Sequence, residues 1–150
     1  METSLYKTDF YRWTVEQSQL LALGKLDGLD LVNLVEEIES LGKQQQQELR
    51  NRIGILLGHI LKWEYQLEKR SKSWLFTIKE QRRELKFLIA DNPSLKSYFT
   101  EAILRGYDQG LDLAIKETSL KYKDLPSVCP YAIEQIFDVT FPEGIEIEFD

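Results

Sequence analysis

Residues 49–67 read LRNRIGILLGHILKWEYQL and contain the clearest periodic pattern in the chain. Apolar side chains recur there in alternating steps of four and three residues, at Leu49, Ile53, Leu56, Ile60, Trp63 and Leu67. Such spacing places them on one face of a helix. Further apolar residues widen this face at Ile55, Leu57 and Leu61. A helix that is apolar over so much of its circumference is central in a fold, so we expect a central helix over residues 43–67.

Two rows of small residues accompany this pattern. Gly54 and Gly58 lie one turn apart on the remaining face of the helix predicted over residues 43–67. A second row recurs at four-residue steps and consists of Ala102, Gly106, Gly110 and Ala114. Small residues let helix backbones approach closely, as they do between membrane helices. We therefore expect a neighbouring helix to pack closely against Gly54 and Gly58.

Similar periodicity predicts four further main helices and a short C-terminal one. Start and stop signals place them at residues 9–24, 30–42, 73–90, 93–117 and 131–138, with Thr8, Asp30 and Ser73 as N-caps. Gly42 either ends the second helix or bends it. The residues of the first helix expected to face inward are Phe10, Trp13, Leu20 and Leu21. The second helix carries one apolar stripe, formed by Leu31, Leu34, Val35, Ile38 and Leu41. Residues 145–149 alternate weakly, as in a short strand.

The composition fits one globular domain. The chain has 150 residues, of which 43% are hydrophobic and 29% are charged, as in ordinary folded proteins of single-domain size. We predict an all-α fold: a single-domain helical bundle over residues 1–150, with about five main helices plus a short C-terminal helix.

The composition also argues against several protein classes. Cys129 is the one cysteine, so the chain has neither an internal disulfide nor a zinc site built from several thiolates. This fits a reducing cytoplasm. The first residues lack the basic start and apolar run of a signal peptide, and no stretch approaches the roughly 20 apolar residues of a membrane span. The net charge of −6 argues against nucleic-acid binding through overall charge, while a local patch stays open. We expect a cytoplasmic protein without a membrane partner.

Five short stretches carry a family resemblance. They are YRW at 11–13, LVEEIESLG at 34–42, HILKW at 59–63, RSKSW at 70–74 followed by TIKEQRR, and CPY at 129–131. In this order and spacing they resemble DUF29, a bacterial, largely cyanobacterial family of domains of unknown function, over nearly the whole chain. The resemblance implies a compact helical fold and supplies no established activity. Leu67 departs from the family pattern, in which proline follows the glutamine, and this departure bears on how the helix over residues 43–67 ends.

His59 is the one histidine and lies between Ile55 and Trp63 within the apolar arc of its helix. Two interpretations stay open. The imidazole is packed and bonded to a carbonyl or carboxylate, or it is a general base or metal ligand. We expect His59 to be at least half buried and to bond a polar side chain, above all Glu37 or Glu39 or another acid nearby. A carboxylate partner would raise the pKa of the imidazole, whereas desolvation would lower it.

Arg52 lies on the same flank of the predicted helix as His59, seven residues earlier. Helical ribonucleases of the HEPN group place an arginine and a histidine about four to six positions apart for general acid/base chemistry on RNA. The match is loose, because Ile53 stands where those enzymes usually have a polar residue. Arg52 and His59 are the candidate catalytic residues.

Glu36, Glu37 and Glu39 have the chemistry of metal ligands, but their spacing argues against a shared metal. At 100° per residue, Glu36 points away from the apolar stripe, while Glu37 and Glu39 lie on opposite flanks. We therefore predict no metal site and no cofactor. The three glutamates are candidate binding residues on a solvated or ion-paired face, and a single weak magnesium site is the alternative.

Residues 62–86 form the one basic region. Its cations outnumber its acids and are Lys62, Lys69, Arg70, Lys72, Lys79, Arg82, Arg83 and Lys86. Aromatic residues lie among them at Trp63, Tyr65, Trp74 and Phe76. Basic groups with aromatic neighbours hold phosphates and stack bases, so nucleic acid is a candidate partner through Lys62–Lys86. The alternative is ordinary ion pairs on helix surfaces.

A candidate anion site lies within this basic region, at a predicted helix start. Its residues are Arg70, Ser71, Ser73 and Trp74. Hydroxyls, free amide groups and cations beside the first turn of a helix suit an anion.

Three functions stay open at this point. The first is a non-enzymatic interaction module that self-associates or binds another protein. The second is an RNA-processing nuclease of a HEPN-like type that uses Arg52 and His59. The third is a phosphate- or anion-binding protein that uses Arg70–Ser73. An imidazole sealed by Trp63 and Ile55 would favour the first over the second.

Overall fold

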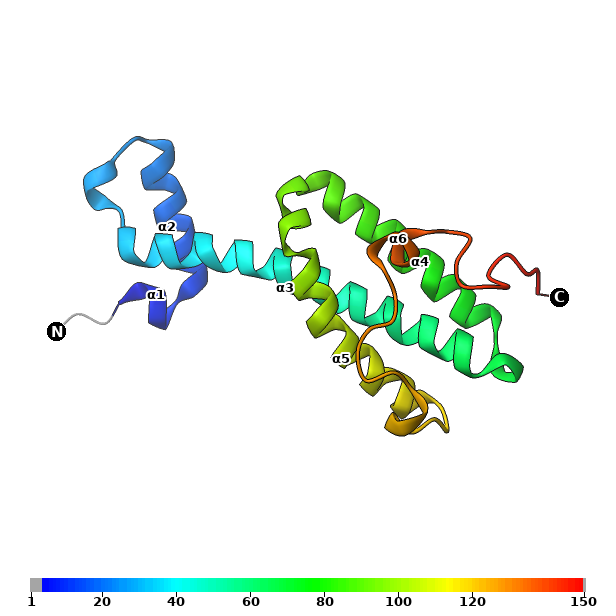
Figure 1. The fold of residues 1–150 in the computed structure, drawn as a ribbon. Coiled ribbons are helices and arrows are strands. Elements are labelled where there is room, and N and C mark those ends of the chain that lie inside the picture. Colours follow the sequence, from blue (N-terminus) through cyan, green and yellow to red (C-terminus); the bar gives the residue numbers. More distant parts are fainter. Residues whose placement is uncertain (1–3, 150) are drawn as a thin grey trace. The chain divides into compact units, whose positions relative to one another are not determined.

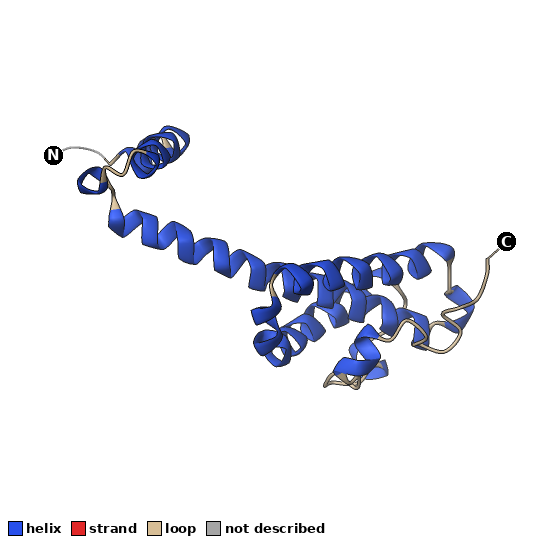
Figure 2. Ribbon diagram, turned by 90° about the horizontal axis from the view of Figure 1, so that it is seen from above, coloured by secondary structure: helices blue, strands red, loops and turns tan. Residues whose placement is uncertain are grey.

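The computed structural model describes residues 4–149, and helices make up 76% of the chain (Figures 1 and 2). No strand occurs in the described part, so the all-α prediction is confirmed. The α-helices are α1 (Leu5–Thr8), α2 (Phe10–Ala22), α3 (Leu31–Tyr65), α4 (Lys72–Asp91), α5 (Phe99–Glu117) and the short α6 (Ile133–Phe137). Short 3-10 helices are η1 (Leu26–Gly28), η2 (Leu67–Lys69), η3 (Pro93–Tyr98) and η4 (Tyr122–Asp124).

Contacts divide the chain into two compact units, residues 1–44 and 45–150, and α3 contributes residues to both. A single folding domain stays a prediction, which one cooperative unfolding transition would support.

The first unit is held together by polar contacts around the start of α3. The Asp30 carboxylate accepts hydrogen bonds from the Trp13 indole at 3.0 Å and from the backbone N–H of Asn33 at 3.4 Å. The Gln17 side chain accepts a bond from the Asp30 backbone N–H at 2.9 Å. The bonds from Asn33 lower the pKa of Asp30. Trp13 and Gln17 are buried, so these bonds fix α2 to the N-terminus of α3.

Two details of the predicted first helix are wrong. Asp9 caps α2 by accepting a bond from the Arg12 N–H, and the separate helix α1 precedes it. Phe10 and Leu21 are 48% and 52% exposed rather than inward-facing. The first unit is too small to surround a helix, so only Trp13 among the predicted inward residues is fully covered.

Of the two alternatives predicted at Gly42, a helix end is wrong, because α3 is one continuous helix of 35 residues. A single glycine costs a helix only about 1 kcal/mol relative to alanine. The flanking glutamines, lysine and leucine are good helix formers. No start or stop signal other than Gly42 interrupts them.

The second unit has its core on residues 49–63 of α3. Leu49, Ile53, Leu56, Ile60 and Trp63 are fully buried, as their spacing predicts. Residues of α4, α5 and α6 and the C-terminal segment complete this core, among them Ile78, Leu85, Ala114, Ile136 and Ile145. Figure 1 shows α4 and α5 beside this part of α3, with α6 against α4.

The two rows of small residues meet each other. A methyl group added at Gly110 would lie 2.9 Å from the Gly58 backbone N, and one added at Gly106 would lie 3.2 Å from the Gly54 N. The backbones of α3 and α5 are therefore in direct contact, which confirms the predicted close approach at Gly54 and Gly58.

Three helix boundaries differ from prediction, and the weak alternation over residues 145–149 does not correspond to a strand. Leu67 lies in η2 and is 61% exposed, so it does not extend the buried face of α3. Ser71, not Ser73, caps α4 by accepting a bond from the Trp74 N–H. Pro93 starts η3, and α5 begins only at Phe99. Residues 145–149 contain no strand, because no second strand is present in the described part to pair with them.

Candidate functional site

Two titratable residues of α3 lie side by side in the core of the second unit. His59 and Lys62 are three positions apart, so they share a helix face. Their side chains are only 8% and 2% exposed. The Lys62 Nζ atom lies 3.5 Å from the His59 Nε2 atom and 3.6 Å from the Glu117 carboxylate at the end of α5. It also lies 4.7 Å from the centre of the Trp74 ring of α4.

Lys62 holds its charge in the core through these neighbours. A buried ammonium group needs an opposite charge or hydrogen-bond acceptors to offset desolvation. Burial lowers the pKa of Lys62, and the carboxylate of Glu117 opposes that shift. The Trp74 ring adds a cation–π contact. Lys62 thus links α3, α4 and α5.

The geometry of His59 assigns its tautomer. The Nδ1 atom lies 2.9 Å from the Ile55 carbonyl oxygen, which can only accept. Nδ1 therefore carries the proton, and in the neutral ring Nε2 accepts from the Lys62 ammonium. Burial is the main cause that lowers the pKa of His59.

His59 is at least half buried, as expected, but the expected partner is wrong. It bonds the Ile55 carbonyl and contacts Lys62 rather than Glu37 or Glu39. That expectation takes the predicted helices over residues 30–42 and 43–67 to be neighbours that pack together as a hairpin at Gly42. The chain instead continues through Gly42 as the single helix α3.

A cavity of about 400 Å³ lies beside this cluster. Its lining residues are Gln66, Lys69, Trp74, Glu117, Thr118 and Ser119. Trp74 and Glu117 therefore separate Lys62 from the cavity. The cluster links three helices and contributes the charged Glu117 to the cavity wall, while the imidazole of His59 stays buried in the core.

The structure does not join Arg52 to His59. The Arg52 guanidinium donates to Glu48 at 3.0 Å and to the Gln81 side chain at 3.3 Å. None of these groups contacts His59, which bonds Ile55 and Lys62. Arg52 thus links α3 to α4, at a position seven residues before His59 in the sequence.

Arg70 is engaged in contacts with the end of α3. Its Nε atom donates to the Trp63 carbonyl at 2.8 Å, and its guanidinium lies 4.7 Å from the centre of the Trp63 ring. The Trp63 indole in turn donates to the Glu143 carbonyl at 2.9 Å. Gly144 follows at a positive φ of 86°, and a methyl group there would lie 2.7 Å from the Arg70 Nη1 atom. Arg70 therefore joins the end of α3 to the C-terminal segment.

The other members of the predicted anion site have separate positions. Ser71 is occupied as the N-cap of α4, at 3.2 Å from the Trp74 N–H. Ser73 is exposed within the first turn, and the Trp74 ring faces Lys62. Anion binding at residues 70–73 stays a prediction.

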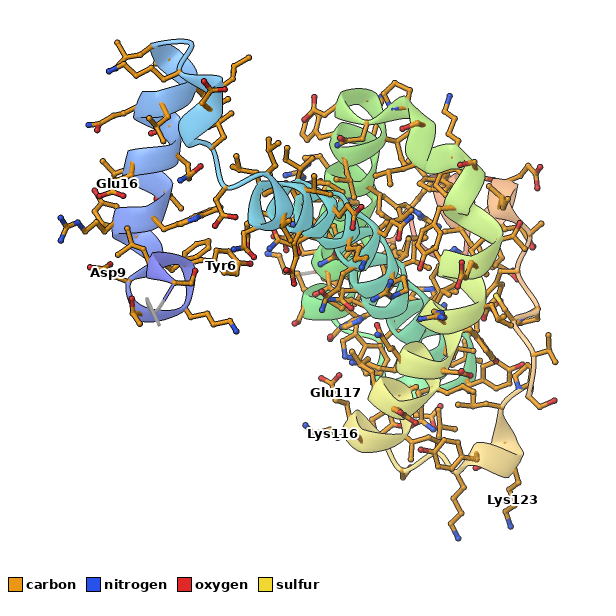
Figure 3. All side chains as sticks on the ribbon, turned by 90° about the vertical axis from the view of Figure 1, so that its left-hand side faces the viewer. Tyr6, Asp9, Glu16, Lys116, Glu117 and Lys123 are labelled. Carbon is orange, nitrogen blue, oxygen red and sulfur yellow. The ribbon has the colours of Figure 1, made fainter. Side chains whose placement is uncertain are left out.

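The three glutamates of the first unit do not converge. Glu37 accepts a hydrogen bond from the Tyr6 hydroxyl, which raises the pKa of Tyr6 to about 12. Figure 3 shows the Tyr6 ring extending from α1. Glu36 and Glu39 are exposed. Within residues 4–149, no group of three histidine, cysteine or acidic residues is placed to hold a metal.

Two cations of the basic region are not on the surface. Lys62 and Arg82 are buried at 2% and 7% exposure. The Arg82 guanidinium donates to the carbonyls of Ile136 at 2.8 Å and Gln135 at 3.2 Å, and so fixes α6 to α4. The cations that remain exposed are Lys69 of η2 and Lys72, Lys79, Arg83 and Lys86 of α4.

One helix face of α3 in the first unit is apolar and exposed. Leu31, Val32, Val35, Ile38 and Leu41 are all more than half exposed, at 63%, 80%, 54%, 66% and 60%. We refer to these five residues as the α3 stripe. Only Leu34 of the predicted apolar stripe is partly covered.

Sequence reasoning missed two members of the buried cluster. Lys62 was grouped with surface cations, and Glu117 was not singled out. The spacing of His59 and Lys62 in HILK was a usable signal, because it places both on one helix face. No local signal connects Lys62 to Glu117, or Arg70 to Glu143 and Gly144, since these residues are far apart in the chain.

Comparison with known proteins gives one match. A family model described as "Domain of unknown function DUF29" matches residues 5–142. No curated protein and no solved structure matches the chain. Within the described residues, no helix has the length and apolar character that crossing a bilayer requires.

Proposed function

Because the chain belongs to the DUF29 family, whose description names no activity, we propose a function from its surface: an interaction module that self-associates through the α3 stripe. The observation that carries this proposal is the exposure of five large apolar side chains along successive turns of one helix. Single exposed apolar residues are ordinary on protein surfaces, whereas a contiguous patch marks an interaction site.

The geometry of the stripe suits another helix. At 100° per residue, Leu31, Val35 and Ile38 fall within a narrow arc, and Leu41 and Val32 border it on either side. Spacing in steps of four and three is the pattern by which two helices interlock side chains. The opposite arc of α3, which includes Glu37, faces α1 through the bond from Tyr6.

A second copy of the chain is the partner that the local charge favours. Glu36 and Glu37 point away from the centre of the arc, which leaves Glu39 as the acid on its flank. Two copies thus bring few like charges together. A symmetric dimer in which the same patch meets itself is also the commonest form of self-association.

The available apolar area is sufficient for a moderate dimer. Complete burial of one such side chain contributes about 1.5–3 kcal/mol. Each of these side chains is still about two thirds exposed, so the five from each of two copies contribute roughly 10–20 kcal/mol if the contact covers them fully. Association costs about 4–15 kcal/mol. A micromolar Kd needs a net gain of about 8 kcal/mol, which lies within this difference, so we expect a dimer in roughly the micromolar range.

The burial of His59 supports the interaction module over the ribonuclease. Its exposed fraction of 8% and its bond to the Ile55 carbonyl leave little access for a substrate. Arg52 is engaged by Glu48 and Gln81. The contacts of Arg70 with Trp63 likewise support a structural role for that residue over anion binding.

Analytical ultracentrifugation across a concentration series tests the proposal. The wild-type chain should reach the mass of two chains at tens of micromolar, and the variant Val35→Glu, Ile38→Glu should stay at the mass of one. The matched control is Val128→Glu, since Val128 is 71% exposed and lies outside the stripe. Circular dichroism checks that each variant is folded. A wild-type chain that stays monomeric at 100 µM, or a Val35→Glu, Ile38→Glu variant that still dimerises, would overturn the proposal.

A further inference from the structure

A cavity of about 710 Å³ opens in the second unit between α4, α5, α6 and the C-terminal segment. Its apolar lining consists of Ile89, Phe99, Phe137, Val139 and Ile145. The remaining lining residues are all cations of α4: Lys79, Arg82, Arg83 and Lys86. Pockets for small molecules have volumes of about 300–1,000 Å³, with mostly apolar walls and a few polar groups that orient the ligand. This cavity has that size and that composition.

The cations gather on one side of α4. Lys79, Arg82, Arg83 and Lys86 follow one another in steps of three, one and three residues, which places them on a single helix face. Of the nearby acids, Glu84 lies about 100° from Arg83 around the helix, while Glu80 is three positions before Arg83 and borders the cationic face. Within residues 4–149, none of the four cations forms a salt bridge. The cavity therefore combines an apolar interior with unneutralised positive charge.

Arg82 adds positive charge at the base of this face. It is 7% exposed, and its hydrogen-bond partners are the carbonyls of Gln135 and Ile136, which carry no charge. The Asp138 carboxylate, which favours the charged form of Arg82, already accepts bonds from the Thr140 N–H and hydroxyl. Burial lowers the pKa of Arg82 to about 10, so the guanidinium remains charged at neutral pH.

We propose that this cavity binds a small amphiphilic carboxylate, an acyl chain that lies against Phe99, Phe137 and Ile145 with its carboxylate at Arg83 and Lys86. Arginine and lysine are the side chains that bind carboxylates most strongly. Nucleic acid fits the cavity less well, because its phosphates need a long charged track and its bases need exposed stacking faces. The site lies outside the α3 stripe, so this proposal and the proposed self-association stand independently.

Isothermal titration calorimetry with dodecanoate, below its micelle concentration, tests the roles of the ligand's charge and of its alkyl chain. One dodecanoate molecule should bind to each protein molecule. Dodecanol, which has the same number of carbon atoms and no charge, should bind at least ten-fold more weakly. Dodecyltrimethylammonium should bind more weakly still, and inorganic phosphate alone should give no heat. Equal affinity for dodecanoate and dodecanol would overturn the role of the cations.

Paired variants locate the site. Arg83→Gln, Lys86→Gln should weaken dodecanoate about ten-fold and leave dodecanol unchanged. The charge-matched control Lys116→Gln, Lys123→Gln should change neither, since both lysines are exposed and lie outside the lining (Figure 3). Val139→Trp should block both ligands by filling the mouth, whereas Val128→Trp should not. Val139 and Val128 are each 71% exposed, so this pair is matched in exposure and in residue size, and only Val139 lines the cavity.

Two outcomes would overturn the proposal. One is dodecanoate binding that neither Val139→Trp nor Arg83→Gln, Lys86→Gln affects, in variants that circular dichroism shows to be folded. The other is a folded wild-type chain that does not bind dodecanoate. A single-stranded RNA that then binds the wild type and loses affinity in Arg83→Gln, Lys86→Gln would assign the basic face to nucleic acid instead.

Discussion

The two ends of α3 have the same apolar spacing but opposite surroundings. Leu49, Ile53 and Ile60, in the second unit, are fully buried. Leu31, Val35 and Ile38, in the first unit, are 63%, 54% and 66% exposed. Periodicity therefore predicts which side of a helix is apolar, whereas neighbouring elements decide whether that side is covered.

The neighbours of each segment explain the difference. The later segment has glycines that meet the glycines of α5, so a long helix packs directly on its backbone. The earlier segment has Gly42, where an added methyl group would meet no other element within 4 Å. There the short α1 and α2 attach to one side of α3 through Glu37 and Asp30. The opposite side keeps its apolar residues at the surface, where the proposed self-association places a second copy.

Truncation of one isoleucine in each segment should give the largest difference in the loss of unfolding free energy. Ile60→Ala should lower the free energy of unfolding by about 2–5 kcal/mol, because it removes buried methylene groups and leaves a cavity. Ile38→Ala should change it by less than about 0.5 kcal/mol, as at other surface positions. Urea unfolding followed by tryptophan fluorescence, at submicromolar concentration, measures both.

The concentration dependence sharpens this test. If the α3 stripe binds a second copy, the cost of Ile38→Ala should grow at tens of micromolar, since association stabilises the folded chain by mass action. The cost of Ile60→Ala should not depend on concentration in this way. An equal loss for both variants at submicromolar concentration would show that the stripe is covered within the monomer.

Two alanine substitutions should change stability in opposite directions. One is at Gly110 of α5, which packs against the later segment of α3, and the other is at Gly42 in the earlier segment. Gly110→Ala should cost about 1–3 kcal/mol, because its methyl group would press on backbone atoms of Gly58 and Gly54 at 2.9 and 3.0 Å. Gly42→Ala should stabilise the chain by up to about 1 kcal/mol, since alanine favours the helix and open space receives the methyl group. Thermal unfolding by circular dichroism measures both. A stabilising Gly110→Ala would contradict the close packing of α3 on α5.

The same contrast explains how much of the fold the sequence predicts. The buried face of residues 49–63 and the meeting of glycine rows follow from spacing, because a packed helix must bury its apolar arc. The break at Gly42 did not follow, since one glycine costs too little to end a helix that its neighbours favour. The exposure of Ile38 also lay beyond the sequence, because it depends on how far α1 and α2 extend over α3.

The candidate sites depend even more on long-range contacts. His59 is buried, as its position between Ile55 and Trp63 predicts. Lys62 looked like a surface cation, and only its distance to Glu117 reveals the ion pair that holds it in the core. Charge spacing on α4 was visible in the sequence, whereas the cavity beside Arg83 requires Phe137 and Ile145 from the distant C-terminal segment.

The pKa of His59 provides the finest test of the comparison. It distinguishes a histidine whose contacts all lie in the second unit from one that bonds a glutamate of the earlier segment of α3. Burial lowers the pKa of His59, the neighbouring Lys62 cation acts in the same direction, and the Ile55 bond and Glu117 oppose them. An NMR titration of this one histidine should therefore show a midpoint below the free value of about 6.5. A midpoint above that value would indicate a carboxylate partner, as a hairpin at Gly42 would have supplied.

The same shift predicts a weak dependence of stability on pH. Since the folded pKa lies below the unfolded one, the unfolded chain binds a proton that the folded chain does not as the pH falls through about 6.5. The contribution of neutral His59 to stability is therefore complete above that pH and is lost as the pH falls toward the folded pKa. Urea unfolding between about pH 5 and 7 measures this loss, with His59→Gln as the control. The variant should lose the histidine part of the slope and keep the part that comes from the carboxylates, so identical slopes in both proteins would show that His59 titrates alike in the folded and unfolded chains.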